Sequence, residues 1–294
     1  MTLKTAYSKG LPFLGEYSWS VVIASLVLAF CVAAVLIGGV KRIASVSQII
    51  VPFMAVIYIV FVLVLVVCNI TAVPAAFATI VKAAFSPKAI TGGAVGSFLV
   101  AMQKGVARGI FSNEAGLGSA PIAAAAAQTK EPVRQGLVSM TGTFIDTIVI
   151  CTLTGLSIVL TGAWQVDGLE GVQVTTYAFQ NGLPLPKELS AFVLMLCLVF
   201  FAFTTILGWD YYSERCLEYL SGGRMKYVKV YRWIYILAVF IGPYMTVSAV
   251  WTIADIFNGL MALPNMIALF ALSGVVVKET RHFFERHRNG EIED

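Results

Sequence analysis

The residues best suited to chemistry lie inside an apolar part of the chain, between Gly105 and Pro121. These 17 residues include four glycines, a proline, Arg108 and Glu114. Glycine and proline disfavour the interior of a helix, so the pattern predicts a broken helix within residues 94–128. Unwound backbone at membrane depth is tolerated where protein buries it or where it lines a cavity. Broken helices of secondary transporters bind substrates and cations in this way, so we expect a binding site here.

Charged side chains within apolar stretches form a second group of candidates. Ionisable residues inside a membrane are costly, and by default they are functional. We expect Arg108 and Glu114 to form a buried ion pair or gate. Asp146 lies deep in another apolar stretch. It is expected to pair with Arg108 or Lys104, or to relay protons.

The other polar residues of the apolar stretches have simpler expected roles. Ser112 and Asn113 are expected to be N-caps of the second half-helix. Asp210, Glu214 and Arg215 are expected to form a solvated or gating network at a helix end. Asp255 and Asn258 are expected to make polar contacts between helices.

The composition argues against a water-soluble enzyme or a nucleic-acid-binding domain. Of the 294 residues, 59% are apolar and only 12% are charged, and the mean hydropathy is +0.85. A soluble domain carries about 25% charged residues. Both histidines, His282 and His287, lie in the polar tail, and the five cysteines show no paired spacing. A membrane-embedded enzyme or a metal site is therefore not indicated, and we expect a polytopic all-α membrane protein without a cofactor.

The apolar stretches predict seven membrane crossings, at about 20 residues for each crossing. Residues 72–91 are shorter and amphipathic, which predicts an interfacial helix. The last crossing is expected to be one helix, locally broken at 258–259 and 264–265. With this count, 13 of the 20 basic residues fall on one side, which predicts a multi-pass protein with a cytoplasmic C-terminus. The expected location is a bacterial-type plasma (inner) membrane. The predicted crossings are 18–40, 49–70, 94–128, 137–164, 189–219, 231–244 and 250–277.

Three strings carry a resemblance to a known family. They are GVARGIFSNEAGLGSAPIAAAAAQT at 105–129, FAFTTILGWDYYSERCLEYL at 201–220 and NGLMALPNMIALFALSGVVV at 258–277. Together they resemble the alanine or glycine:cation symporter family, the sodium:alanine symporters. The resemblance implies a LeuT-type inverted-repeat fold and the import of a small neutral amino acid with Na⁺, sometimes with H⁺.

The resemblance covers the C-terminal part of that fold, core helices four to ten. It implies an N-terminally truncated chain without the extra helix and core helices one to three, and no GTGN-like string occurs. The implied organisation has three parts. Residues 1–91 hold the last two helices of the first repeat and the interfacial helix, residues 92–278 form the complete second five-helix repeat, and residues 279–294 form a cytoplasmic tail.

The resemblance also implies the residues of the site. The substrate would lie against the broken helix, and hydroxyl oxygens would bind a sodium ion, a hard cation that prefers oxygen ligands. An aromatic residue one turn further on would close the pocket, unless it belongs to an interfacial belt. The implied substrate residues are Phe111, Ser112, Asn113, Gly116, Gly118 and Trp209, and the implied sodium ligands are Thr204 and Thr205.

Two of these assignments have alternatives. Phe111 suits a pocket for an apolar side chain, and it equally suits core or lipid packing. Threonine in a membrane helix more often bonds to its own backbone, and only the resemblance favours Thr204 and Thr205 as ligands. The resulting hypothesis is sodium-coupled symport of alanine or glycine, with this chain carrying about half of the site. The alternative is a non-transporting subunit or gene fragment that works only with the missing N-terminal helices.

Overall fold

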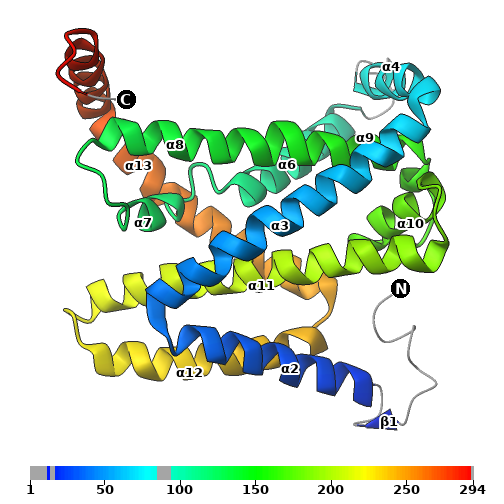
Figure 1. Cartoon of the computed structure of the whole chain (residues 1–294), viewed down its shortest axis with the longest axis horizontal. Helices are drawn as coiled ribbons and strands as arrows, with labels where there is room; N and C mark the ends of the chain where they lie inside the picture. Colours follow the sequence, from blue (N-terminus) through cyan, green and yellow to red (C-terminus); the bar gives the residue numbers. More distant parts are fainter. Residues whose placement is uncertain (1–11, 14–16, 85–93, 293–294) are drawn as a thin grey trace. The chain divides into compact units, whose positions relative to one another are not determined.

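The computed structural model describes residues 12–13, 17–84 and 94–292 of the chain. These residues are almost entirely helical (Figure 1), which confirms the predicted all-α class. Two strands of two residues each, β1 (Pro12–Phe13) and β2 (Tyr17–Ser18), pair antiparallel before the first helix.

The helices divide between two compact units, which we describe separately. The first unit comprises residues 1–84 and 153–246, and the second comprises residues 85–152 and 247–294. Each unit therefore joins segments that are far apart in the sequence. Compact units and sequence repeats need not coincide, so the predicted repeat boundaries stay a prediction.

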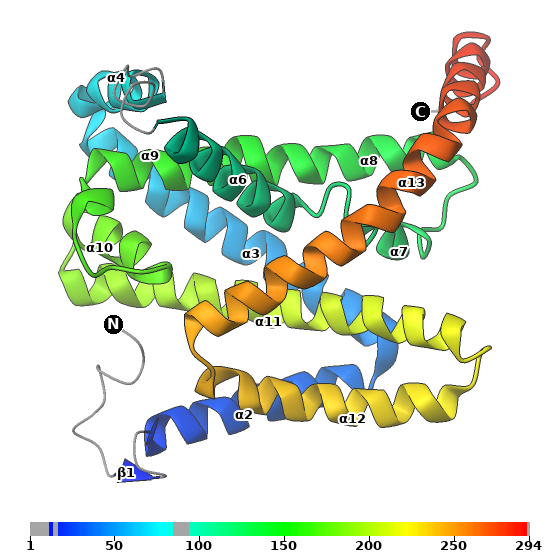
Figure 2. The ribbon, with the colours of Figure 1, turned by 180° about the vertical axis from the view of Figure 1, so that it is seen from behind.

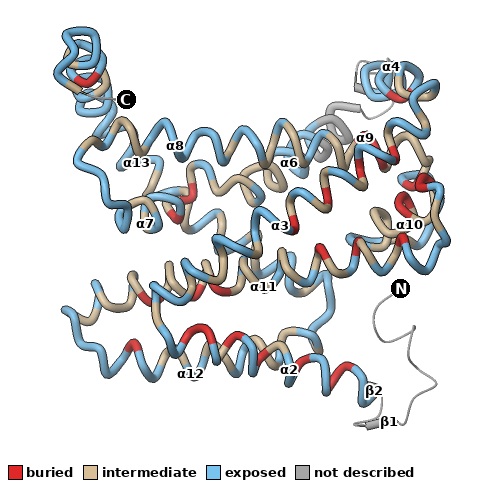
Figure 3. Tube along the Cα trace, viewed as in Figure 1, coloured by how far each residue is buried: buried red, intermediate tan, exposed pale blue. Residues whose placement is uncertain are grey.

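The first unit is built around the long helix α11 (Lys187–Leu220). It packs along α3 (Gly39–Cys68), α10 (Val172–Gly182) and α12 (Met225–Ile241), and α2 (Trp19–Leu36) packs against α12. Buried positions in Figure 3 mark where these helices touch. The shorter elements of the first unit are η1 (Ile70–Ala72), α4 (Val73–Ala84), α9 (Thr152–Leu160), η3 (Ala163–Gln165) and η4 (Gly242–Tyr244).

An apolar cluster joins four helices of the first unit. Val32, Val35 and Leu36 of α2 and Leu207 of α11 form its buried centre, and half-buried residues of α3 and α12 pack around them. Because α2 is apolar on every face, it buries one side in this cluster and leaves large apolar side chains exposed on others. Such a helix is expected to face lipid.

The second unit contains the broken helix. Helix α6 (Ala94–Asn113) is followed by the short α7 (Ala120–Ala124), and α6 packs against the π-helix η2 (Ile145–Cys151). The π-helix lies between α8 (Pro132–Phe144) and α9 in one continuous helical stretch. The last helix, α13 (Val247–Arg288), contacts α8.

Five helices of the described residues are long and apolar enough to cross a membrane. In each of these helices, at most 39% of the most apolar 18-residue segment is buried inside the protein. Lipid is therefore expected to cover the remaining apolar surface. The other two predicted crossings correspond to α12, which has only 17 residues, and to α6, which is less apolar than α2 or α3. The chain is a multi-pass membrane protein, and a total of seven crossings stays a prediction. The five helices are Trp19–Leu36, Gly39–Cys68, Pro132–Leu160, Lys187–Leu220 and Val247–Arg288.

Two predicted interruptions are absent from the described residues. The predicted loop after Arg42 is helical, because α3 begins at Gly39 and continues through Pro52. The last crossing has no local break, since α13 continues through Pro264 and into the predicted tail (Figure 2). Single prolines are tolerated in membrane helices. The predicted interfacial helix is helical as α4 as far as Ala84, and its remainder lies outside the described residues. Its place at the membrane interface stays a prediction.

Candidate functional site

The break in the predicted helix lies between α6 and α7 and is shorter than predicted. Helix α6 runs through Gly105 and Gly109 and ends at Asn113, so only residues 114–119 are non-helical. The backbone there has positive φ at Glu114 (56°), Gly116 (85°) and Gly118 (82°). Residues other than glycine rarely adopt this backbone conformation. The left-handed residues turn the chain away from the axis of α6.

Ser112 and Asn113 do not cap the second half-helix, contrary to prediction. They form the end of α6, and the residue before α7 is Ser119. Asn113 Oδ1 instead accepts a hydrogen bond from the backbone N–H of Ala115, 2.9 Å away. Ser119 Oγ donates to Glu114 Oε2 at 2.7 Å. The break is thus closed locally by its own polar side chains.

The end of α6 is tied to the π-helix η2 by two side-chain hydrogen bonds. Ser112 Oγ donates to Asp146 Oδ2 at 2.8 Å, and Asn113 Nδ2 donates to Thr147 Oγ1 at 3.2 Å. Asp146 therefore meets a hydroxyl group, where a basic partner was predicted. A π-helical turn displaces the side chains that follow it, and such turns are frequent at functional sites. Here it presents a carboxylate and a hydroxyl to the end of α6.

Arg108 has a different partner from the one predicted. Its Nη2 donates to Asp255 Oδ2 of α13 at 2.8 Å, and its guanidinium carbon lies 3.9 Å from the centre of the Trp251 ring. Glu114 lies beyond the end of α6 and accepts a hydrogen bond from Ser119 instead. The expected role of Asp255 as a polar contact between helices is confirmed.

Aromatic packing places Phe111 beside the same tryptophan. The rings of Phe111 and Trp251 meet edge to face, with centroids 5.2 Å apart. Phe111 is half-buried, while Ser112 next to it is exposed. An apolar wall and a polar hydroxyl are therefore adjacent at the end of α6, as a site for a small amphiphilic molecule requires.

The break leaves backbone carbonyl groups without partners in a helix, and α13 donates a hydrogen bond to one of them. Asn265 Nδ2 donates to the carbonyl oxygen of Gly116 at 2.9 Å. A Cβ atom at Gly118 would lie 3.2 Å from Cγ and Oδ1 of Asn265. Glycine at 118 therefore permits both the left-handed backbone and the close approach of α13. Sequence reasoning did not select Asn265, Thr147 or Trp251, although an asparagine next to Pro264 in an apolar helix was a usable signal.

The predicted sodium ligands and Trp209 all lie on α11, in the first unit. Thr204 Oγ1 donates to the carbonyl oxygens of Phe200 (3.0 Å) and Phe201 (3.2 Å), which is the self-bonding that threonine commonly makes in helices. The side chain of Thr205 is exposed. Trp209 packs edge to face on Tyr212 at 5.8 Å. Sodium binding by these two threonines stays a prediction.

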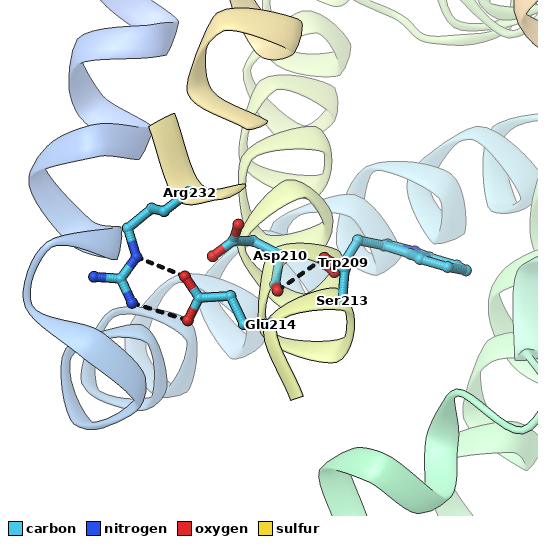
Figure 4. A network of polar contacts seen from close by, with 5 residues as sticks. All are labelled: Trp209, Asp210, Ser213, Glu214 and Arg232. Atoms are coloured by element: carbon cyan, nitrogen blue, oxygen red, sulfur yellow. Dashed lines mark hydrogen bonds and ion pairs between the residues drawn. The ribbon is translucent and has the colours of Figure 1, made fainter. Parts of the chain in front are cut away.

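Directly after Trp209, α11 carries a polar network that is buried, where the sequence predicted a solvated or gating network. Asp210 is 1% exposed and Glu214 is 5% exposed, so a solvated network is wrong for both residues, while a gating network stays a prediction. Glu214 binds Arg232 of α12 with both carboxylate oxygens (Figure 4). Arg215 is partly exposed and pairs with Glu218. The apolar α2 and the aromatic α12 cover this face of α11 and exclude water.

The described residues offer no conventional metal centre. No group of three or more His, Cys, Asp or Glu side chains in these parts of the chain is placed to hold a metal ion. Around the break, the second unit offers neutral hydroxyl, amide and carbonyl groups and the carboxylates of Asp146 and Glu114, beside an aromatic pair. Such groups bind a small zwitterion or an alkali cation through many weak contacts.

The chain is similar to known proteins over most of its length. Residues 4–294 match a family described as the sodium:alanine symporter family. An uncharacterised transporter of Haemophilus influenzae is 54% identical over 90% of this chain, the sodium/alanine symporter AgcS of Methanococcus maripaludis is 48% identical over 91%, and the amino-acid carrier protein AlsT of Bacillus subtilis is 37% identical over 94%. The matches cover 58%, 58% and 57% of those relatives, so the chain spans less than two thirds of their length.

Proposed function

Because the chain belongs to the sodium:alanine symporter family, we propose that it forms the C-terminal part of a secondary transporter that carries a small neutral amino acid into the cell together with Na⁺. The family is one of transporters, not of enzymes. The observation that carries the proposal is the break at 114–119, whose flanking residues bind η2 and α13 through Ser112, Asn113 and Gly116.

The break supplies the groups that recognise an amino acid. The carboxylate of a zwitterion is bound by exposed N–H groups, and its ammonium group is bound by carbonyl and carboxylate oxygens. Ser112 lies at the surface of the unit, and Asp146 is half-buried behind it. Phe111 and Trp251 provide an apolar wall, which suits the methyl group of alanine. Glycine is the smaller alternative substrate.

The sodium ion is proposed to bind hydroxyl oxygens of Thr205 and Thr204. Thr205 supports this role because its side chain is exposed and available to a cation. Thr204 would have to share its hydroxyl with the helix backbone. The family resemblance implies this sodium site. It also implies the LeuT-type inverted-repeat fold and the seven crossings, and all three belong to the proposal.

The experiment is uptake of labelled alanine into proteoliposomes under an inward sodium gradient. The chain is tested with the helices that precede the matching region in its relative AgcS. Ser112→Ala should lower uptake about tenfold, the effect of one lost hydrogen bond of about 1.4 kcal/mol, and Thr205→Ala should weaken the sodium dependence. Ser273→Ala and Thr79→Ala are matched controls, because both hydroxyls are exposed and bond only to nearby backbone carbonyls in the described structure.

An alternative follows from the 58% coverage of the relatives. In that case the chain is a membrane subunit or fragment that transports nothing without the missing N-terminal helices. Reconstitution of the chain alone tests the alternative. Sodium-dependent uptake by the chain alone would contradict the alternative, and uptake that never depends on sodium would contradict the proposed symport.

A further inference from the structure

The first unit holds two carboxylates buried side by side on α11. Asp210 and Glu214 are four residues apart, hence on one face of the helix, and they are 1% and 5% exposed. Asp210 lies ten residues before the last residue of α11, which is about 15 Å from that end at 1.5 Å per residue. The two carboxyl groups point to the side on which Arg232 lies, and Trp209 points away from it (Figure 4).

Glu214 pairs with the guanidinium group of Arg232, which is the positive charge of this network. Arg232 Nε donates to Glu214 Oε1 at 2.6 Å, and Arg232 Nη2 donates to Oε2 at 2.8 Å. Such a bidentate pair engages both oxygens of the carboxylate. Oδ1 of Asp210 is buried and has no hydrogen-bond partner among the described residues. The network therefore contains two acids and one base.

The other ionisable groups nearby do not supply a second positive charge. Helix α2 contributes no Asp, Glu, Lys, Arg or His. The lysines and arginine on the facing ends of α3 and α12 are exposed, and Arg215 of α11 pairs with Glu218. The exposed groups are Lys41, Arg42, Lys226 and Lys229; other titratable groups of these helices include the exposed Cys216 and two tyrosines of α12, Tyr231 and Tyr235.

The tyrosines do not neutralise Asp210 either. Tyr235 donates its hydroxyl to the carbonyl oxygen of Ile206 at 2.8 Å, so that proton is engaged with the backbone. Ser213, on the next turn of α11, donates to the backbone carbonyls of Trp209 and Asp210. A second ionised carboxylate in this apolar surrounding would be repelled by Glu214 and left without compensation, which is strongly unfavourable.

We propose that Asp210 is a proton-binding site, in which the neutral acid shares its proton with Glu214 while Arg232 neutralises the Glu214 carboxylate. The acid proton comes from the aqueous phase, and its release would leave two carboxylates competing for one guanidinium. Carboxylic acids at membrane depth serve as proton relays in pumps and transporters. Any use of this proton in a transport cycle rests on the proposed function, but the binding of the proton does not.

Infrared spectroscopy tests the proton without any transport measurement. The purified chain in lipid nanodiscs should show the carbonyl stretch of a protonated carboxylic acid at neutral pH, in choline chloride and in sodium chloride alike. Asp210→Asn should abolish this band. Glu279→Gln, which removes an exposed carboxyl group of α13, is the matched control and should leave it unchanged.

Glu214→Gln provides a second and independent test. The variant leaves Arg232 free to pair with Asp210, which should then ionise, so the band should again be lost. The proposal is overturned if the wild-type band is absent at neutral pH, or if the band survives in either Asp210→Asn or Glu214→Gln. It is also overturned if sodium at constant pH removes the band, because the site would then bind sodium instead of a proton. Asparagine resembles the neutral acid in shape, so Asp210→Asn should retain the thermal stability of the wild type.

Discussion

Gly118 is the residue of the break whose lack of a side chain has the clearest physical reason. Its φ is +82°, and side-chain atoms of Asn265 lie 3.2 Å from where a Cβ atom would be. Gly118→Ala should cost about 1–2 kcal/mol from the left-handed backbone alone and should loosen the contact with α13. The measurement is thermal unfolding in detergent. Gly105→Ala is the control, because Gly105 is helical with open space around it, and a larger loss there than at Gly118 would refute this explanation.

Arg108 makes a second prediction at the scale of single residues. Its partner Asp255 and the arginine side chain are each 35% exposed, so screening limits the worth of the pair to about 1 kcal/mol or less. The ring of Trp251 adds a cation–π contact. Arg108→Lys should therefore destabilise the second unit less than Trp251→Ala, which also removes the partner of Phe111. Chemical unfolding of both variants decides this, and equal losses would count against the aromatic contact.

The sequence predicted which residues gather at the break better than it predicted their partners. The glycine-rich pattern predicted a broken helix, and the family resemblance implied Gly116, Gly118, Ser112 and Asn113 as residues at the break. The partners of Arg108 and Asp146 depend on how α6 faces η2 and α13, which no local pattern encodes. Burial of Asp210 depends in the same way on the packing of α2 and α12 over α11.

At the scale of elements, α13 supports the break from outside. Asn265 is the residue of α13 that binds the Gly116 carbonyl group. Asn265→Ala should leave α13 helical and should raise amide hydrogen exchange in residues 114–119 several-fold, because the turn loses its tie to a long helix. Asn258→Ala, seven residues earlier on α13 and also half-buried, is the matched control. Unchanged exchange in Asn265→Ala would show that the turn holds itself.

Hydropathy predicted the apolar helices well and their interruptions poorly. The stretches at 18–40 and 49–70 correspond to α2 and α3, yet α3 begins ten residues before the predicted start. Basic residues such as Lys41 and Arg42 end an apolar run without ending a helix, because both have good helix propensity. Pro264 likewise failed to break α13. In contrast, the cluster of glycines after Asn113 did mark a real break.

At the scale of the whole molecule, the distribution of basic residues predicts the orientation in the membrane. Seven crossings would place 13 of the 20 basic residues on one side, which the bias of basic residues predicts to be the cytoplasm. A cysteine introduced at the C-terminal end, Glu291→Cys, should resist a membrane-impermeant thiol reagent in intact cells and react after permeabilisation. The natural cysteines are first replaced by alanine. Reaction in intact cells would mean an even number of crossings or the opposite orientation.

The central claim is coupling of amino-acid movement to sodium, and gradient reversal tests it most directly. Proteoliposomes containing the chain and the preceding helices of its relative are loaded with equal labelled alanine inside and outside. An inward sodium gradient should drive alanine to accumulate above its external concentration, an outward gradient should deplete it, and equal sodium should leave it unchanged. Accumulation that ignores the direction of the sodium gradient would contradict sodium-coupled symport.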